Sequence, residues 1–187
     1  MSENYEIYGP LAPLIGEWQR DKGLDSAPEP EGEEKAPYYE TPLFEPVGNV
    51  SNAEKGCSYA LRYHQVAYRK SNDKAFHNQT GCWMWSATTG TIMQSLIIPR
   101  GVCVLAGGHY EGAYTAGEPL ELFVLARVGD PDWGVSQSPF MRDNASTKAF
   151  EHSIRVVGDK LRYRESTLLD IYGRAFDHTD GNMLVRA

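Results

Sequence analysis

The chain has 187 residues and a net charge of −7, with 41% apolar and 23% charged residues. These values predict one domain, spanning residues 1–187, with a substantial core. The acidic balance and the lack of a basic cluster argue against nucleic acid as a partner. No apolar run is long enough to span a bilayer, and the first ten residues lack the apolar stretch of a secretion signal.

The three cysteines, at 57, 82 and 103, form no disulfide framework, so we expect reduced thiols and a cytoplasmic protein. Residues 1–9 are predicted to be an N-terminal tail, and Pro10–Gly16 a short helical turn. Trp18 follows in a Gly-x-Trp motif. Its indole is large enough to plug one end of a barrel, so we interpret Trp18 as structural.

The negative charge is concentrated near the N-terminus. Between Asp21 and Glu45 there are eight acidic and two basic residues, and prolines stand at positions 28, 30, 37 and 42. Proline removes a backbone donor and fixes φ. We therefore expect residues 23–37 to be an acidic, proline-rich loop between the first two strands.

From residue 58 onward the pattern is that of β-strands. Runs rich in β-branched and aromatic residues end at turn signals, and no amphipathic helical window lies between them. The predicted strands are 58–69, 75–87, 91–98, 102–110, 120–128, 148–157, 161–171 and 182–186. Gly158-Asp159 is a two-residue hairpin signal. A second helical turn is expected at Pro139–Asn144.

Such a meander must protect its edge strands. Closure does this directly, so we predict an all-β fold: a single antiparallel up-and-down barrel of about ten strands, with a two-sheet sandwich as the alternative. A barrel of this size can enclose one small apolar or amphipathic ligand. The acidic loop could cover or reshape its mouth.

The segment 76–85 carries large residues on both of its alternating faces. One face holds Phe76, Cys82 and Met84, and the other holds His77, Trp83 and Trp85. One face should line the cavity. The sequence leaves open which, although the first set is the more apolar.

The five histidines include no pair at metal-ligand spacing. Haem iron, however, needs only one protein ligand, and a single histidine at the mouth of an apolar cavity can supply it. His178 closes the predicted loop Gly173–Asp177 before the last strand. The alternative interpretation is a solvated loop histidine between Asp177 and Asp180.

Together these motifs resemble the nitrobindin family, which includes the C-terminal domain of a human THAP protein. The resemblance is carried, in order, by residues 11–18 (LAPLIGEW), Phe76-His77 with Gly81, residues 92–101 (IMQSLIIPRG), Gly107-Gly108, Lys160-Leu161-x-Tyr163, and His178 before Leu184-x-Arg186. It implies a ten-stranded, fatty-acid-binding-protein-like barrel that binds one haem b, with His178 as the axial iron ligand. It also places Phe76, His77 and Ile98 on the pocket side, His77 as a distal neighbour. The family's ferric haem is associated with nitric oxide binding and with isomerisation of peroxynitrite to nitrate.

Two departures bear on the ligand. Arg20 and Lys22 stand where the family has glycines, and the residues after His178 are polar and one longer than in the haem binders. The chain in this respect resembles a bacterial fatty-acid-binding-protein-like branch of the family.

Three hypotheses therefore stand. In the first, His178 binds haem while Phe76, Met84 and Ile98 shape a dry pocket. In the second, a haem-free carrier or sensor of a fatty-acid-like or other apolar molecule meets a carboxylate with Arg62, Tyr63 or Arg164. In the third, Trp83, Trp85 and Met84 fill the interior of an interaction module. The sequence leaves the oligomeric state open.

Overall fold

The structure is a computed structural model that describes residues 5–52, 56–112 and 114–187. Its elements, in chain order, are the 3-10 helix η1 (Tyr5–Leu14), β1 (Gly16–Glu29), β2 (Gly32–Glu40), β3 (Leu43–Asn52), β4 (Gly56–Arg69), β5 (Ala75–Trp85), β6 (Thr91–Ile98), β7 (Val102–His109), β8 (Leu120–Arg127), β9 (Val135–Gln137), the helix α1 (Pro139–Asn144), β10 (Ala145–Val157), β11 (Lys160–Ile171) and β12 (Arg174–Arg186). Among the described residues, no helix has the length and apolar character needed to cross a membrane.

The strands close into an antiparallel barrel of ten positions, as predicted. Neighbours in the sheet follow the chain from β4 to β8 and from β10 to β12, and β12 returns to pair with β1. Strands β2 and β3 share one position, because each pairs with a different part of both β1 and β4. The short strand β9 pairs with the edge of β7. Within the described residues, β12 and β1 close the ring, and the pairing between β7 and β8 is limited to Gly107 opposite Leu125.

Two predicted irregular segments are in fact regular. The expected acidic loop at residues 23–37 is a β-hairpin, in which Asp25 pairs with Ala36 and Pro28 with Glu33. The prolines were misleading because Pro30 lies in the turn itself and Pro28 lies near the strand end, where its missing donor is tolerated. Likewise the last strand begins at Arg174 instead of residue 182, so His178 lies inside β12.

The N-terminal segment also differs from the expected tail. From Tyr5 onward it is helical, and Tyr8, Leu11 and Leu14 are buried against the strands. Gly9 has φ +53° there, and a Cβ at this position would come within 2.3 Å of the Trp85 ring. Only glycine fits this close approach.

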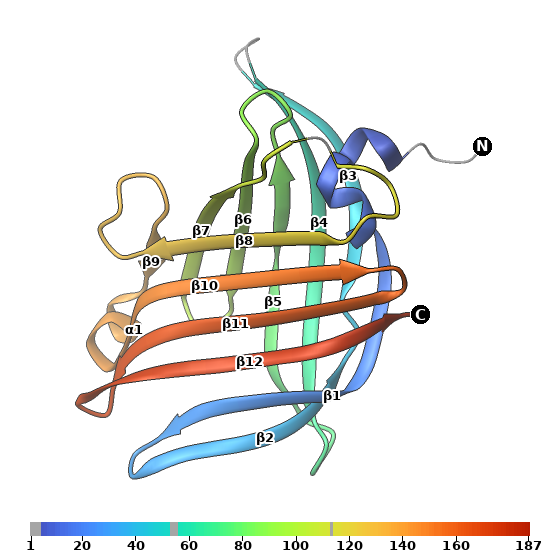
Figure 1. The fold of residues 1–187 in the computed structure, drawn as a ribbon. Coiled ribbons are helices and arrows are strands. Elements are labelled where there is room, and N and C mark those ends of the chain that lie inside the picture. Colours follow the sequence, from blue (N-terminus) through green and yellow to red (C-terminus); the bar gives the residue numbers. More distant parts are fainter. Residues whose placement is uncertain (1–4, 53–55, 113) are drawn as a thin grey trace.

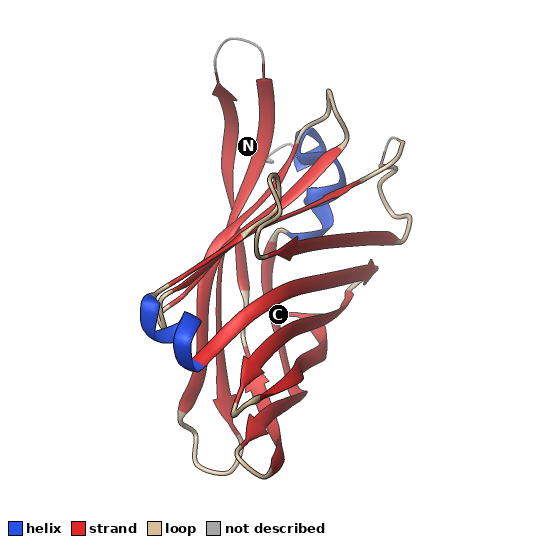
Figure 2. Ribbon diagram, turned by 90° about the vertical axis from the view of Figure 1, so that its left-hand side faces the viewer, coloured by secondary structure: helices blue, strands red, loops and turns tan. Residues whose placement is uncertain are grey.

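The two helices lie at opposite ends of the barrel (Figure 1), and the view turned by 90° separates them in the same way (Figure 2). Under η1 the interior is apolar. Trp18 is fully buried there, its indole N–H donates to the carbonyl of Leu14 (2.8 Å), and the Arg186 guanidinium lies 4.3 Å from its ring centroid. This burial agrees with the structural role predicted for Trp18.

Candidate functional site

A cavity of about 230 Å³ lies inside the barrel at the α1 end. It is bounded by the start of β10, by the second half of β11, by His178 and Asp180 of β12, by residues near the tip of the β1–β2 hairpin and by Met141 of α1. Its lining residues are Ala27, Pro28, His77, Ile98, Arg100, Val102, Met141, Ala145, Thr147, Phe150, Glu165, Thr167, Leu169, Ile171, Tyr172, His178 and Asp180. The walls are mainly apolar and the polar groups are concentrated on a few side chains, as in most small-ligand sites.

His178 is part of this wall and is half-buried. Strand β12 alternates, so His178, Asp180 and Asn182 all point to the interior. The ring Nε2 of His178 lies 2.7 Å from Oδ1 of Asp25 on the neighbouring strand β1. Asp25 is only 3% exposed. The histidine is therefore held in place by a buried carboxylate, and the solvated-loop interpretation is wrong.

Two more of the predicted site residues line the same cavity. His77, near the start of β5, contacts Oε1 of Gln79 through its Nε2 (3.1 Å), and Ile98 ends β6. Burial lowers the pKa of His77, an effect that the hydrogen bond to Gln79 opposes. His77 is therefore a neutral imidazole at physiological pH.

The remaining two predicted residues do not line the cavity. On β5 it is the His77–Trp83 face that points inward, because Ala67, Gln65 and Leu61 of β4 lie opposite it. Met84 alternates to the other face. Phe76 lies at an irregularity in the β4–β5 pairing and packs its ring on Tyr38, 5.8 Å between centroids. The more apolar face was thus the wrong guide, since this barrel turns polar side chains inward.

Two of the three residues predicted to meet a ligand carboxylate lie on the outside of the barrel. Arg62 is exposed and pairs with Glu45 (2.9 Å), and Arg164 is also exposed. Only Tyr63 points inward, 3% exposed, and its hydroxyl accepts a hydrogen bond from Gln94. Trp83 and Trp85 pack among the barrel's core side chains, but they leave the α1-end cavity open.

Beneath the cavity lies a buried hydrogen-bonded group of side chains, which we call the interior network. It consists of Tyr38, Glu40, Tyr63, Gln65, Gln79, Gln94, His152, Tyr163, Glu165 and Asn182. Glu165 joins the network to the cavity, because it lines the cavity and accepts from Gln79 (3.1 Å). Among its members, sequence reasoning proposed a ligand contact only for Tyr63, and it named Tyr163 only as part of the family resemblance.

The electrostatics of this floor follow from crowded carboxyls in a dry interior. Burial raises the pKa of Glu165 to about 7, with Glu40 adding to the effect. Burial also raises the pKa of Asp180 well above its usual value, and Glu165 and Glu40 raise it further. Oδ1 of Asp180 is buried and makes no hydrogen bond within the described part of the chain. The floor of the cavity therefore holds crowded carboxyl groups whose protonated form is favoured. It disfavours the added negative charge of a ligand carboxylate.

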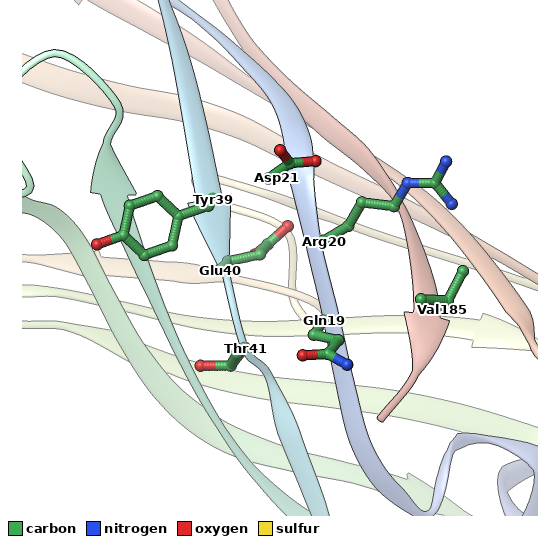
Figure 3. A pocket seen from close by; sticks show the side chains of 7 residues that line it. All are labelled: Gln19, Arg20, Asp21, Tyr39, Glu40, Thr41 and Val185. Carbon is green, nitrogen blue, oxygen red and sulfur yellow. The ribbon is translucent and has the colours of Figure 1, made fainter.

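A second hollow, of about 440 Å³, lies on the wall of the barrel (Figure 3). It sits where β1 loses register with both β2 and β12 between residues 19 and 24. Beside it Asp21 is exposed and Arg20 is partly buried, and the carboxyl group of Glu40 is used inside the barrel by Tyr163, Gln65 and Asn182. The α1-end cavity is the stronger candidate, because it alone of the two presents histidines.

This architecture defines a barrel that binds a small ligand inside. A family model described as "THAP4-like, heme-binding beta-barrel domain" matches residues 7–186, and the chain belongs to this family. Among solved structures, the crystal structure of Rv2717c from M. tuberculosis superposes with a TM-score of 0.67 at 22% sequence identity, over 95% of this chain and 94% of that one. That likeness shows the shared fold. No curated protein sequence matches the chain.

The family's haem can be tested against the residues present. His178 lies on the cavity wall, Asp25 engages its Nε2, and no hydrogen bond to its Nδ1 is found in the described ranges, so one nitrogen retains a lone pair for iron. Ile98, Leu169 and other apolar side chains supply the dry wall that a porphyrin needs. Arg100 adds a cation at the rim. The donor set therefore fits haem.

Proposed function

We propose that the protein binds haem b in the α1-end cavity, with His178 as the axial ligand of the iron. One observation carries this proposal: His178 is the cavity histidine whose Nε2 is held by a buried carboxylate while its Nδ1 makes no such bond in the described structure. A carboxylate that accepts a hydrogen bond from one ring N–H makes the other nitrogen a better metal ligand. The resemblance and the family membership agree with this assignment.

The chain's own residues have separate tasks in this proposal. His178 supplies the iron ligand, the apolar side chains around it exclude water, and Arg100 is the cation available to the propionate groups. When bound, the haem supplies the iron chemistry that the family resemblance associates with nitric oxide and peroxynitrite. We infer that this chemistry, including isomerisation of peroxynitrite, belongs to the same cavity.

Haem titration of the purified protein tests the proposal. We expect a saturable Soret band that His178→Ala abolishes. The matched control is His64→Ala, because His64 is exposed on the outside of β4 and its ring hydrogen-bonds to Asn78 (3.0 Å) on the neighbouring strand. No saturable binding to the wild type, or equal binding by wild type and His178→Ala, would overturn the assignment.

The second candidate is a haem-free carrier of an apolar molecule. The observation in its favour is the orphaned oxygen of Asp180 beside Glu165, which suits a ligand that ends in a hydrogen-bond donor. The same oxygens disfavour a fatty acid entering carboxylate first. Native mass spectrometry of the protein as purified separates the candidates: a mass increment of haem supports the first, and a smaller apolar molecule with a donor group supports the second.

A further inference from the structure

Asp25 is an unexpected residue at its position. It lies on β1 directly opposite Asp180 of β12, and both side chains face the barrel interior. The neighbouring Leu24 is 50% exposed, so this part of β1 turns its acid inward and its apolar residue outward. Directly opposed like charges destabilise a sheet, and burying a carboxylate costs free energy. Stability alone does not account for Asp25.

The contact between Asp25 and His178 explains why a carboxylate is buried at this position. Its Oδ1 lies 2.7 Å from Nε2 of His178, two residues along β12 from Asp180. A neutral imidazole that donates Nε2–H to this oxygen keeps its lone pair on Nδ1. The carboxylate thereby fixes both the tautomer and the orientation of the ring.

The other cavity histidine is held differently. His77 contacts the neutral side-chain amide oxygen of Gln79, whose amide nitrogen donates to Gln65 and Glu165. A carboxylate partner raises the donor strength of an imidazole toward a metal, whereas an amide oxygen carries no charge to transfer. The two histidines therefore differ in their second partner, although both line one cavity.

We propose that Asp25 is the positioning residue that makes His178, and not His77, the ligand of the iron. This inference rests on the haem binding proposed above and adds the choice between two histidines. Asp25 acts through His178 and does not itself contact the haem.

The test compares Asp25→Asn with the wild type, because asparagine preserves the shape and removes the charge. Asp21→Asn is the matched control on the same strand, since Asp21 is exposed and forms a surface ion pair with Lys70 (3.3 Å). In haem-free protein, nitrogen-15 NMR of the histidine rings reports the tautomer. We expect the Nε2–H form of His178 in the wild type and the control, and a mixture of tautomers in Asp25→Asn.

In the haem-loaded protein we expect Asp25→Asn to weaken haem affinity about 10- to 100-fold, the usual effect of losing an outer partner of a metal-bound histidine. The iron–histidine stretching frequency of the ferrous form should fall and the reduction potential should rise, because the ligand donates less charge. A merely structural Asp25 would change the melting temperature and leave both signatures unchanged.

The outcomes separate the two proposals. If the wild type binds haem and Asp25→Asn matches it in tautomer, affinity and stretching frequency, the role of Asp25 is overturned while haem binding stands. If His77→Ala and not His178→Ala removes the iron–histidine signal, the choice of ligand is overturned. If the wild type takes up no haem, the proposed function fails, and the ligand choice fails with it.

Discussion

Beneath η1 the barrel is filled by Leu11, Leu14, Trp18 and other apolar side chains, whereas toward α1 the same strands turn histidines and carboxyls inward. The apolar end gains free energy from burial, at about 25 cal/mol per Å². The polar end spends free energy on desolvating side chains such as Glu165 and Asp25. The apolar end thus stabilises the fold. The polar end lowers stability, so its residues are better explained by ligand binding than by folding.

The largest expected effect comes from breaking the apolar end. Trp18→Ala removes a fully buried indole, its hydrogen bond to Leu14 and its contact with Arg186, and should lower the free energy of unfolding by about 3–5 kcal/mol. Denaturant unfolding measures the loss. His178→Ala should abolish haem uptake and should lower the free energy of unfolding by less than Trp18→Ala does, although it leaves the buried carboxylate of Asp25 without this partner. A stable Trp18→Ala protein, within about 1 kcal/mol of the wild type, would contradict the division of the barrel.

A smaller loss is expected from the interior network. The Tyr163 hydroxyl donates to Glu40 (2.7 Å), accepts from Gln65 (3.1 Å) and shares a hydrogen bond with Tyr38 (2.6 Å). Tyr163→Phe leaves these buried partners incompletely bonded and should cost about 1–3 kcal/mol. Tyr172→Phe, at an exposed position, is the control for denaturant unfolding. Equal stability of the two variants would show that water replaces the missing hydroxyl.

The same division explains what the sequence could predict. Alternating patterns and turn signals located the strands from β4 to β11 within a few residues, except the short β9, and α1 at its observed bounds, because burial on one face imposes period two. Residues 23–37 were assigned to a loop, so no face could be assigned to Asp25, and Gly173–Asp177 was assigned to a loop before a last strand at residues 182–186. The resemblance supplied His178. The interior network could not be predicted, since inward polar residues such as Gln94 have the pattern of an outer face.

The pH dependence of the free energy of unfolding reports on two buried titratable residues of the polar end, Glu165 and His152. Burial raises the pKa of Glu165 to about 7, so its contribution is fully present at low pH and is lost as the pH rises from about 4.5 to about 7. Burial lowers the pKa of His152 to about 3, so its contribution is lost as the pH falls from about 6.5. His152 Nδ1 lies 3.1 Å from Glu165, and the two slopes oppose each other between pH 4.5 and 6.5.

We therefore expect Glu165→Gln to make the slope of stability against pH more positive than in the wild type over that range, because the falling contribution of Glu165 is removed. The difference in slope should be about 1 kcal/mol per pH unit for one proton. Denaturant unfolding at a series of pH values measures it. The exposed Glu121→Gln, which removes a surface pair with Arg155, should keep the wild-type slope. An unchanged slope in Glu165→Gln would contradict the assignment.

The smallest effect is expected at the rim of the cavity. Arg174 donates through Nη2 to the backbone carbonyls of Glu29 and Gly32, and so fastens the tip of the β1–β2 hairpin to β12. Ala27 and Pro28, next to that tip, line the cavity. Because Arg174 is exposed, Arg174→Ala should change the free energy of unfolding by less than about 0.5 kcal/mol.

The effect of Arg174→Ala should appear instead in ligand release. A looser hairpin should raise the haem dissociation rate about two- to threefold, which corresponds to about 0.5 kcal/mol. Transfer of haem to an excess of apomyoglobin measures this rate. Arg162→Ala is the matched control, because Arg162 is also an exposed arginine and lies near the start of β11, far along the strand from the hairpin between β11 and β12. If both variants release haem at the wild-type rate, the contact of Arg174 with the acidic hairpin does not control ligand release, and the expectation that this hairpin covers the mouth of the barrel is contradicted.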